Sequence, residues 1–96
     1  NVHVVYSMPG AIRGNHYHVV GTEICTITGP AQVCYREAGE VVTRRVPDAE
    51  VWRFTFPPGV SHAFRNEGTQ PMILAAFNTE AHDPNRPDAV RDVLIE

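Results

Sequence analysis

Apolar and polar residues alternate along most of this chain, in short runs that turn residues separate. Because residues i and i+2 of a strand share a face, this alternation predicts half-buried strands. We predict strands at Val2–Ser7, His16–Val20, Glu23–Thr28, Gln32–Glu37, Val51–Phe56, Ser61–Asn66 and Met72–Asn78, with a further strand within Val41–Val46. Gly- and Pro-rich turns separate them. Only Asp88–Glu96 suggests a helix.

Short strands with no amphipathic helix between them are typical of an antiparallel sandwich or barrel. The 96 residues suffice for one domain with a modest core. Because the chain begins at Asn1 and not at Met, we expect residues 1–96 to be a single domain that is trimmed or belongs to a longer chain. The apolar run Val2–Tyr6 would leave an exposed strand edge, and pairing with a second copy would cover it, which predicts a homodimer.

Composition and charge narrow the function classes. The net charge of −3 gives no electrostatic reason to expect nucleic acid or an anionic membrane surface as a partner. No apolar run approaches membrane-spanning length and no signal peptide opens the chain, so we expect a cytoplasmic protein.

Two segments supply a candidate metal site. His16 and His18 are two residues apart on a predicted strand and project together, with Glu23 shortly after them. The parity of Glu23 is wrong for an uninterrupted strand, and a bulge or loop at Gly21-Thr22 would reset it. His62 follows the Pro57-Pro58-Gly59 turn. Three imidazoles and one carboxylate suit a divalent transition metal, zinc before nickel, iron or manganese.

The two cysteines allow several interpretations. If Gly29-Pro30 were a two-residue hairpin turn, Cys25 would lie opposite Cys34 across a ladder. The pair would then form a disulfide or offer a soft ligand. We expect two reduced thiols that fill the interior as small apolar groups.

These residues resemble the two motifs of the cupin family. Gly10, His16, His18, Glu23 and Gly29 fit G-x5-H-x-H-x3,4-E-x6-G, with one residue fewer before the last glycine. Pro57, Gly59, His62 and Asn66 fit P-x-G-x2-H-x3-N, while Val51 stands where a glycine is expected. The resemblance implies an all-β antiparallel cupin barrel, or jelly roll, with His16, His18, Glu23 and His62 as the metal ligands.

A narrower resemblance concerns the segment Arg13-Gly-Asn-His-Tyr-His18 and the tail Phe77–Asp88. Both are similar to the C-terminal cupin domain of bacterial capsular-polysaccharide enzymes that reduce and epimerise UDP-linked 4-keto sugars. A looser one links Arg13 and His16 to metal-free dehydrorhamnose epimerases, in which such an arginine binds substrate and the histidine is catalytic. Both imply a nucleotide-sugar ligand and an epimerase or isomerase in polysaccharide or deoxysugar biosynthesis, with Arg13 binding substrate. No reductase domain is present in this chain.

An epimerase must remove a proton next to a ketone. A divalent cation stabilises the developing oxygen charge, and a separate base takes the proton, because coordination would occupy the lone pair of His16. The candidate acid/base groups are Tyr6, His3, Tyr35 and His82.

Two further functions stay open. An oxidative, dioxygenase-type cupin needs a redox-active metal and an apolar pocket, which Trp52, Phe54, Phe56 and Phe64 could line; we name Trp52 as a candidate substrate contact. Those aromatics are otherwise core residues. A non-catalytic sugar-binding module would need neither a base nor an open metal position.

Overall fold

The computed structural model of the chain describes residues 2–81 and 83–96. In these residues it is built from strands alone, without a helix. The nine strands are β1 (Val2–Ser7), β2 (Ile12–His18), β3 (Glu23–Thr28), β4 (Ala31–Glu37), β5 (Glu40–Val46), β6 (Val51–Phe56), β7 (His62–Asn66), β8 (Met72–Asn78) and β9 (Ala89–Arg91).

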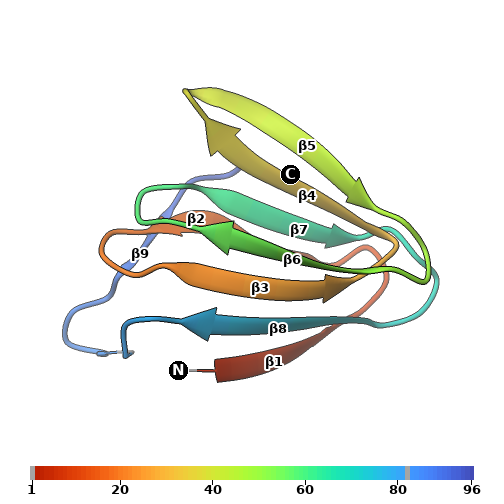
Figure 1. Cartoon of the computed structure of the whole chain (residues 1–96), viewed down its shortest axis with the longest axis horizontal. Helices are drawn as coiled ribbons and strands as arrows, with labels where there is room; N and C mark the ends of the chain where they lie inside the picture. The colour runs from red at the N-terminus through yellow and green to blue at the C-terminus, as the bar shows by residue number, and fades with distance from the viewer. Residues whose placement is uncertain (1, 82) are drawn as a thin grey trace.

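The strands form two antiparallel sheets that face each other (Figure 1). Sheet A has the order β1-β8-β3-β6, and sheet B has the order β5-β4-β7-β2-β9. Consecutive strands therefore often lie in different sheets, as in a jelly roll. The all-β class and this topology are confirmed, but the sheets stay separate and do not close into a barrel.

The core lies between the two inner faces. Along β3, β6 and β8 every second side chain points inward, as the period of a strand requires. Its buried members include Ile27, Val33, Val46, Phe56, Phe64, Met72 and Leu74. Trp52 and Phe54 pack against them while partly exposed, so these aromatics belong to the core.

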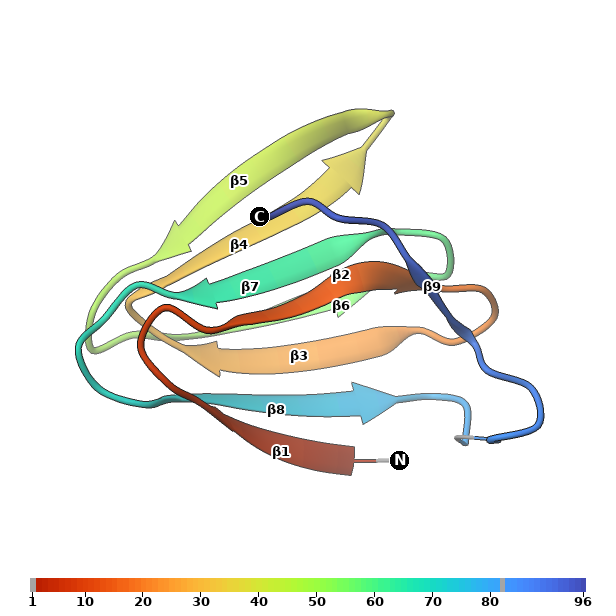
Figure 2. The same cartoon turned by 180° about the vertical axis from the view of Figure 1, so that it is seen from behind.

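The C-terminal segment is not helical, contrary to the prediction for Asp88–Glu96. Residues Ala89–Arg91 add β9 to the edge of β2, and the remaining tail lies over the outer face of sheet B (Figure 2). Leu94 and Ile95 pack there against Cys34 and Ala63. The tail is extended because its polar and apolar groups contact residues of sheet B. Nothing in the sequence of the tail itself indicates those contacts.

The hairpin that would have joined Cys25 to Cys34 does not exist. The chain passes from sheet A to sheet B at Gly29-Pro30, so β3 and β4 do not pair. Both cysteines are free and buried, as expected for reduced thiols. They lie apart, however: Cys25 is in the core between the sheets, and Cys34 lies on the outer face of sheet B under the tail.

Strand β1 is the edge of sheet A and pairs only with β8. Val2, Val4 and Tyr6 project from it with more than half of their surface exposed. Homodimerisation through this edge stays a prediction. No helix long and apolar enough to cross a membrane occurs in residues 2–81 and 83–96.

Candidate metal centre

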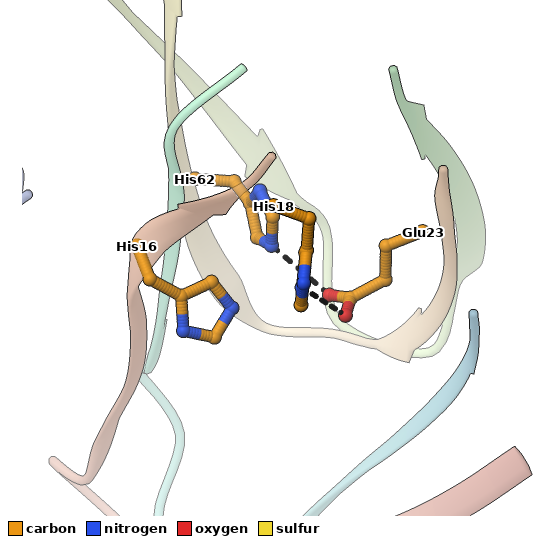
Figure 3. A group of neighbouring side chains, drawn as sticks. All are labelled: His16, His18, Glu23 and His62. Atoms are coloured by element: carbon orange, nitrogen blue, oxygen red, sulfur yellow. Dashed lines mark hydrogen bonds and ion pairs between the residues drawn. The ribbon is translucent and has the colours of Figure 1, made fainter. Parts of the chain in front are cut away.

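Four side chains from three strands and both sheets converge at one end of the sandwich. His16 and His18 come from β2, His62 from the start of β7, and Glu23 from the start of β3 (Figure 3). One potential ligand atom from each lies within 4.8 Å of the others. The structure thus brings together all four ligands that the sequence predicted. Glu23 lies in the opposite sheet and faces the histidines. The loop between His18 and Glu23 crosses from sheet B to sheet A, so the alternation expected of one continuous strand does not apply to Glu23.

A bulge in β2 turns the two histidines inward. The register shifts between Gly14 and His16, so that His16 lies opposite His62. Gly14 and Asn15 both have positive φ, at 87° and 58°. Without this extra residue, Arg13 and His16, three positions apart, would project from opposite faces of the sheet. With it, both share the inner face of sheet B with Phe64 and His62.

Only glycine fits at position 14. A Cβ there would lie 2.7 Å from the backbone oxygen of His62, in addition to the positive φ. The glycine lets β2 approach β7 closely at the point where both deliver a ligand.

Asn15 ties the bulge to the C-terminal tail. Its Oδ1 accepts hydrogen bonds from the amides of Leu94 and Ile95 at 2.8 and 3.1 Å. Its Nδ2 donates to the carbonyl of Ile95 at 2.9 Å, and its own carbonyl accepts from the amide of Asp92. The buried amide therefore meets its hydrogen-bonding needs with the tail.

The ring of His62 is oriented by the backbone. Its Nδ1 lies 3.0 Å from the carbonyl oxygen of Val60, which can only accept, so Nδ1 carries the proton. In the neutral ring Nε2 then presents a lone pair toward Oε1 of Glu23, 3.0 Å away. Two acceptors at that distance require a positive species between them, either a proton or a cation. Phe56 stacks on the ring with centroids 4.3 Å apart.

His18 is held in a similar way. Its Nε2 lies 2.8 Å from Oε2 of Glu23, and its Nδ1 lies 3.5 Å from Oδ2 of Asp88. Asp88 also accepts hydrogen bonds from the amides of Val19, Val20 and Gly21 at 2.8, 2.9 and 3.2 Å. Burial alone would raise the pKa of Asp88, but these amides outweigh it and the pKa is lowered. The carboxylate stays charged beside His18.

The electrostatics of the site favour a neutral His16 and an ionised Glu23. Burial, reinforced by the neighbouring His62, lowers the pKa of His16 to about 4. Burial alone would raise the pKa of Glu23, but the hydrogen bond and charge of His62 outweigh it and lower the pKa to about 2. The Cys25 thiol donates to Oε1 of Glu23 at 3.2 Å, and burial raises its pKa, so this thiol stays protonated.

The other candidate residues are scattered. Arg13 is exposed on the same face as the histidines. His3 lies opposite Ala76, which lies opposite Cys25, so His3 belongs to the inner face of sheet A and is exposed at its edge. Tyr6 is 62% exposed on the outer face of that sheet, away from the ligands.

The two aromatic candidates, Tyr35 and Trp52, lie outside the cluster of four residues. Tyr35 is opposite His62 on β4, and its hydroxyl accepts a hydrogen bond from Arg44 at 3.3 Å. A hollow of about 510 Å³ beside it is lined by Phe54 and Phe56 and contains none of the four ligands. Trp52 lies further along β6, with its indole bonded to Glu50. His82 lies outside the described residues.

Sequence reasoning missed Asn15 and Asp88. Their partners are 67 to 80 residues away along the chain, so no local pattern marks them. The one available signal was Gly14-Asn15 itself, a pair of residues that tolerate positive φ and often mark a bulge.

Residues 1–90 match the polysaccharide biosynthesis C-terminal domain family. The chain belongs to this family.

Two relatives of this polysaccharide biosynthesis domain are bacterial proteins of polysaccharide synthesis or assembly. The spore coat polysaccharide biosynthesis protein SpsL of Bacillus subtilis (strain 168) is 29% identical over 93 residues, which cover 88% of this chain and 62% of SpsL. The capsular polysaccharide assembling protein CapF from Staphylococcus aureus is 27% identical, with a TM-score of 0.85, over 96% of this chain and 26% of CapF. The domain thus spans less than two thirds of either relative.

The fold is also shared with more distant structures. The sugar 3,4-ketoisomerase QdtA from Thermoanaerobacterium thermosaccharolyticum, solved in complex with TDP, superposes with a TM-score of 0.74 at 17% identity. The alignment covers 96% of this chain and 66% of QdtA.

Proposed function

We propose that this domain binds one divalent transition metal, zinc before nickel, iron or manganese, and acts on a nucleotide-linked 4-keto sugar as an epimerase or isomerase in surface-polysaccharide or deoxysugar biosynthesis. The observation that carries the proposal is the convergence of His16, His18, Glu23 and His62 within 4.8 Å. This domain spans only part of its relatives. The activity of any longer protein that contains the domain is therefore also a proposal.

The donor set fits such an ion. The low pKa values of His16 and Glu23 leave a free imidazole lone pair and an ionised carboxylate at neutral pH. His62 already donates through Nδ1 to Val60, so its Nε2 would be the ligating atom. A bound divalent cation would supply Lewis-acid polarisation of a substrate carbonyl oxygen.

The names of the relatives support the proposed substrate class. SpsL and CapF are named for polysaccharide biosynthesis or assembly. QdtA is a ketoisomerase that has been solved with TDP-4-keto-6-deoxyglucose. CapF has been solved with the inhibitor 3-isopropenyl-tropolone, and tropolones carry adjacent oxygens that chelate divalent metals. A nucleotide-linked keto sugar as substrate, with a divalent metal held by the four residues to polarise its ketone, would account for all three observations.

Two further roles, phosphate binding and acid/base catalysis, fall to other residues of this chain. Arg13, on the ligand-bearing face, binds the phosphates of the substrate. We favour His3 as the acid/base group, because it faces sheet B from the exposed edge of sheet A. Tyr35 follows, and Tyr6 would need a second copy of the chain to approach a ligand.

Elemental analysis of the purified protein, beside His16→Ala/His62→Ala, tests the metal. We expect near-stoichiometric zinc or nickel in the wild type and none in the double variant, with both proteins folded. Bound iron or manganese would keep the metal site but add weight to the oxidative alternative, which the exchange experiment below then decides. A folded wild type that retains no metal after exposure to these ions would contradict the proposed site.

Deuterium exchange tests the reaction. TDP-4-keto-6-deoxyglucose in deuterated water should gain deuterium at the carbon next to the ketone with metal-loaded wild type, and not with the double variant. TDP-glucose, which has no ketone, is the control substrate. Tight binding of the keto sugar without deuterium exchange would mean that the domain is a binding module and not an enzyme.

A further inference from the structure

Arg91 lies beside the metal ligands, although it is far from them in sequence. Strand β9 pairs with β2 so that Arg91 is opposite His16 and Ala89 is opposite His18. Residues directly opposite in an antiparallel pair project from the same face. The arginine therefore projects from the face of sheet B that carries the histidines.

The neighbour of Arg91 supports this orientation. Asp92 accepts two hydrogen bonds from Arg36 and one from Ser61. Arg36 has the parity of Cys34, which lies on the outer face of sheet B. Since consecutive side chains of an extended segment alternate, Asp92 on the outer face places Arg91 on the inner one.

Arg13 flanks His16 on its other side. The bulge at Gly14-Asn15 places it on the same face, opposite Phe64. Three residues along β2 and one strand across separate the Cα atoms of Arg13 and Arg91 by roughly 11 Å. Two long side chains from these positions can meet over one ligand beside His16.

Both guanidinium groups are available. Arg13 and Arg91 are exposed, and neither guanidinium has a hydrogen-bond or ion-pair partner among the described residues. Arg36, Arg45 and Arg65, by contrast, are each bonded to an acidic group or a backbone carbonyl. The chain has a net charge of −3, yet the only carboxylate in the ligand cluster is Glu23, which the histidines already engage.

From this juxtaposition we infer that Arg91 and Arg13 form a two-arginine clamp for the pyrophosphate group of the substrate, beside the metal centre. Planar guanidinium forks match phosphate oxygens in pairs, and two forks suit the two phosphates of a nucleoside diphosphate sugar. The inference rests on the proposed function and adds a residue from the C-terminal strand to it. The clamp would hold the sugar next to His16 while the nucleoside extends outward.

Calorimetric titration of the metal-loaded full chain with UDP, pyrophosphate and uridine tests the clamp. Arg91→Gln should weaken UDP and pyrophosphate about tenfold or more, the loss that follows removal of a charge-assisted hydrogen bond. Arg91→Lys should lose less, because it keeps the charge without the fork. The matched control is Arg53→Gln, an exposed arginine on the outer face of sheet A with the same change in net charge. Its UDP affinity should equal that of the wild type.

A double variant sharpens the result. If both arginines hold one pyrophosphate, Arg13→Gln/Arg91→Gln should weaken UDP by less than the product of the two single effects. Equal UDP binding by Arg91→Gln and Arg53→Gln would overturn the clamp alone. If the metal-loaded wild type binds neither UDP nor pyrophosphate, the nucleotide-sugar function fails as well. Unchanged metal content and thermal melting in each variant separate these outcomes from damage to the site or fold.

Discussion

The two sheets differ in how they hold the candidate metal ligands. Sheet A contributes Glu23 from a ladder in which β3 pairs with β6 and β8 without a shift in register. Sheet B contributes three histidines from strands that meet at a bulge, and its β2 is covered along its last residues by the tail strand β9. Sheet A is regular and contributes one of the four residues. Sheet B contributes the other three, from two strands whose pairing is interrupted by the bulge.

This difference indicates where the stability of the site is vulnerable. In sheet A, the position of Glu23 follows from strand alternation and burial of its neighbours Cys25 and Ile27. In sheet B, the positions of His16 and His18 depend on two residues with positive φ and on contacts from the chain's last residues. Substitutions that restore a regular strand in β2 should therefore damage the site more than comparable substitutions elsewhere.

The largest effect is expected from Gly14→Ala. Alanine at positive φ costs about 1–2 kcal/mol, and its Cβ would lie 2.7 Å from the oxygen of His62, which forces β2 and β7 apart. We expect a loss of about 3 kcal/mol in the free energy of unfolding, together with weakened metal binding. Urea denaturation measures the first effect and elemental analysis the second.

Gly39→Ala is the matched control, since Gly39 has φ of 84° but no atom lies within 4 Å of the position that a Cβ would occupy there. It should lose only about 1 kcal/mol and keep its metal. Equal losses in the two variants would mean that backbone strain alone matters, and that the close approach of β2 to β7 does not.

The same contrast explains how much the sequence could predict. Four strands of sheet A, β1, β3, β6 and β8, have the predicted boundaries, because their alternation is uninterrupted. In sheet B the prediction began β2 at His16, whereas the strand runs from Ile12 to His18. The bulge breaks the alternation of apolar and polar residues there. A prediction from that alternation alone therefore misses the part of the strand that precedes the bulge.

The tail could not be predicted for a different reason. Asp88–Glu96 gains its extended form from Asn15, Arg36 and Ser61, which are distant in sequence. Tertiary contacts outweigh the weak helical preference of a short segment. The convergence of His16, His18, Glu23 and His62 was predictable because short motifs mark these four residues. The residues that orient them, Asn15 and Asp88, carry no local signal.

A smaller effect concerns acid stability of the metal-free protein. The pKa of His16 falls from 6.5 to about 4 on folding, so between these values the unfolded chain binds a proton that the folded chain does not. Stability must therefore decrease as the pH falls through this window. From pH 6.5 to 4.5 this shift corresponds to a loss of about 2 kcal/mol in the free energy of unfolding. Partial solvent screening makes the expected loss smaller than this figure. Below pH 4.5 Glu23, whose pKa is about 2 in the folded state, adds a loss of the same sign.

His16→Gln should flatten the stability curve between pH 6.5 and 4.5, because it removes the titrating ring from sheet B. His3→Gln, at the exposed edge of the regular sheet A, should leave the curve of the wild type unchanged. Urea denaturation at several pH values measures both. A wild-type curve that stays level over this range would refute the assignment of a half-buried, unprotonated His16.

The smallest effect is expected from Asp88→Asn, which alters one oxygen of the tail contact to sheet B. The amide oxygen can still accept from Val19 and Val20, as Oδ1 does in the wild type. The NH2 group that replaces Oδ2 can accept neither from Gly21 nor from Nδ1 of His18. A carboxylate behind a metal-binding histidine fixes its ring and raises its basicity, so metal affinity should fall about tenfold. Competition with a chelating indicator measures it, and Asp48→Asn, at an exposed position in the turn before β6, should show the wild-type affinity. Equal affinity in both variants would mean that β2 and its bulge orient His18 without the tail, and that the irregular sheet holds its ligands as independently as the regular one.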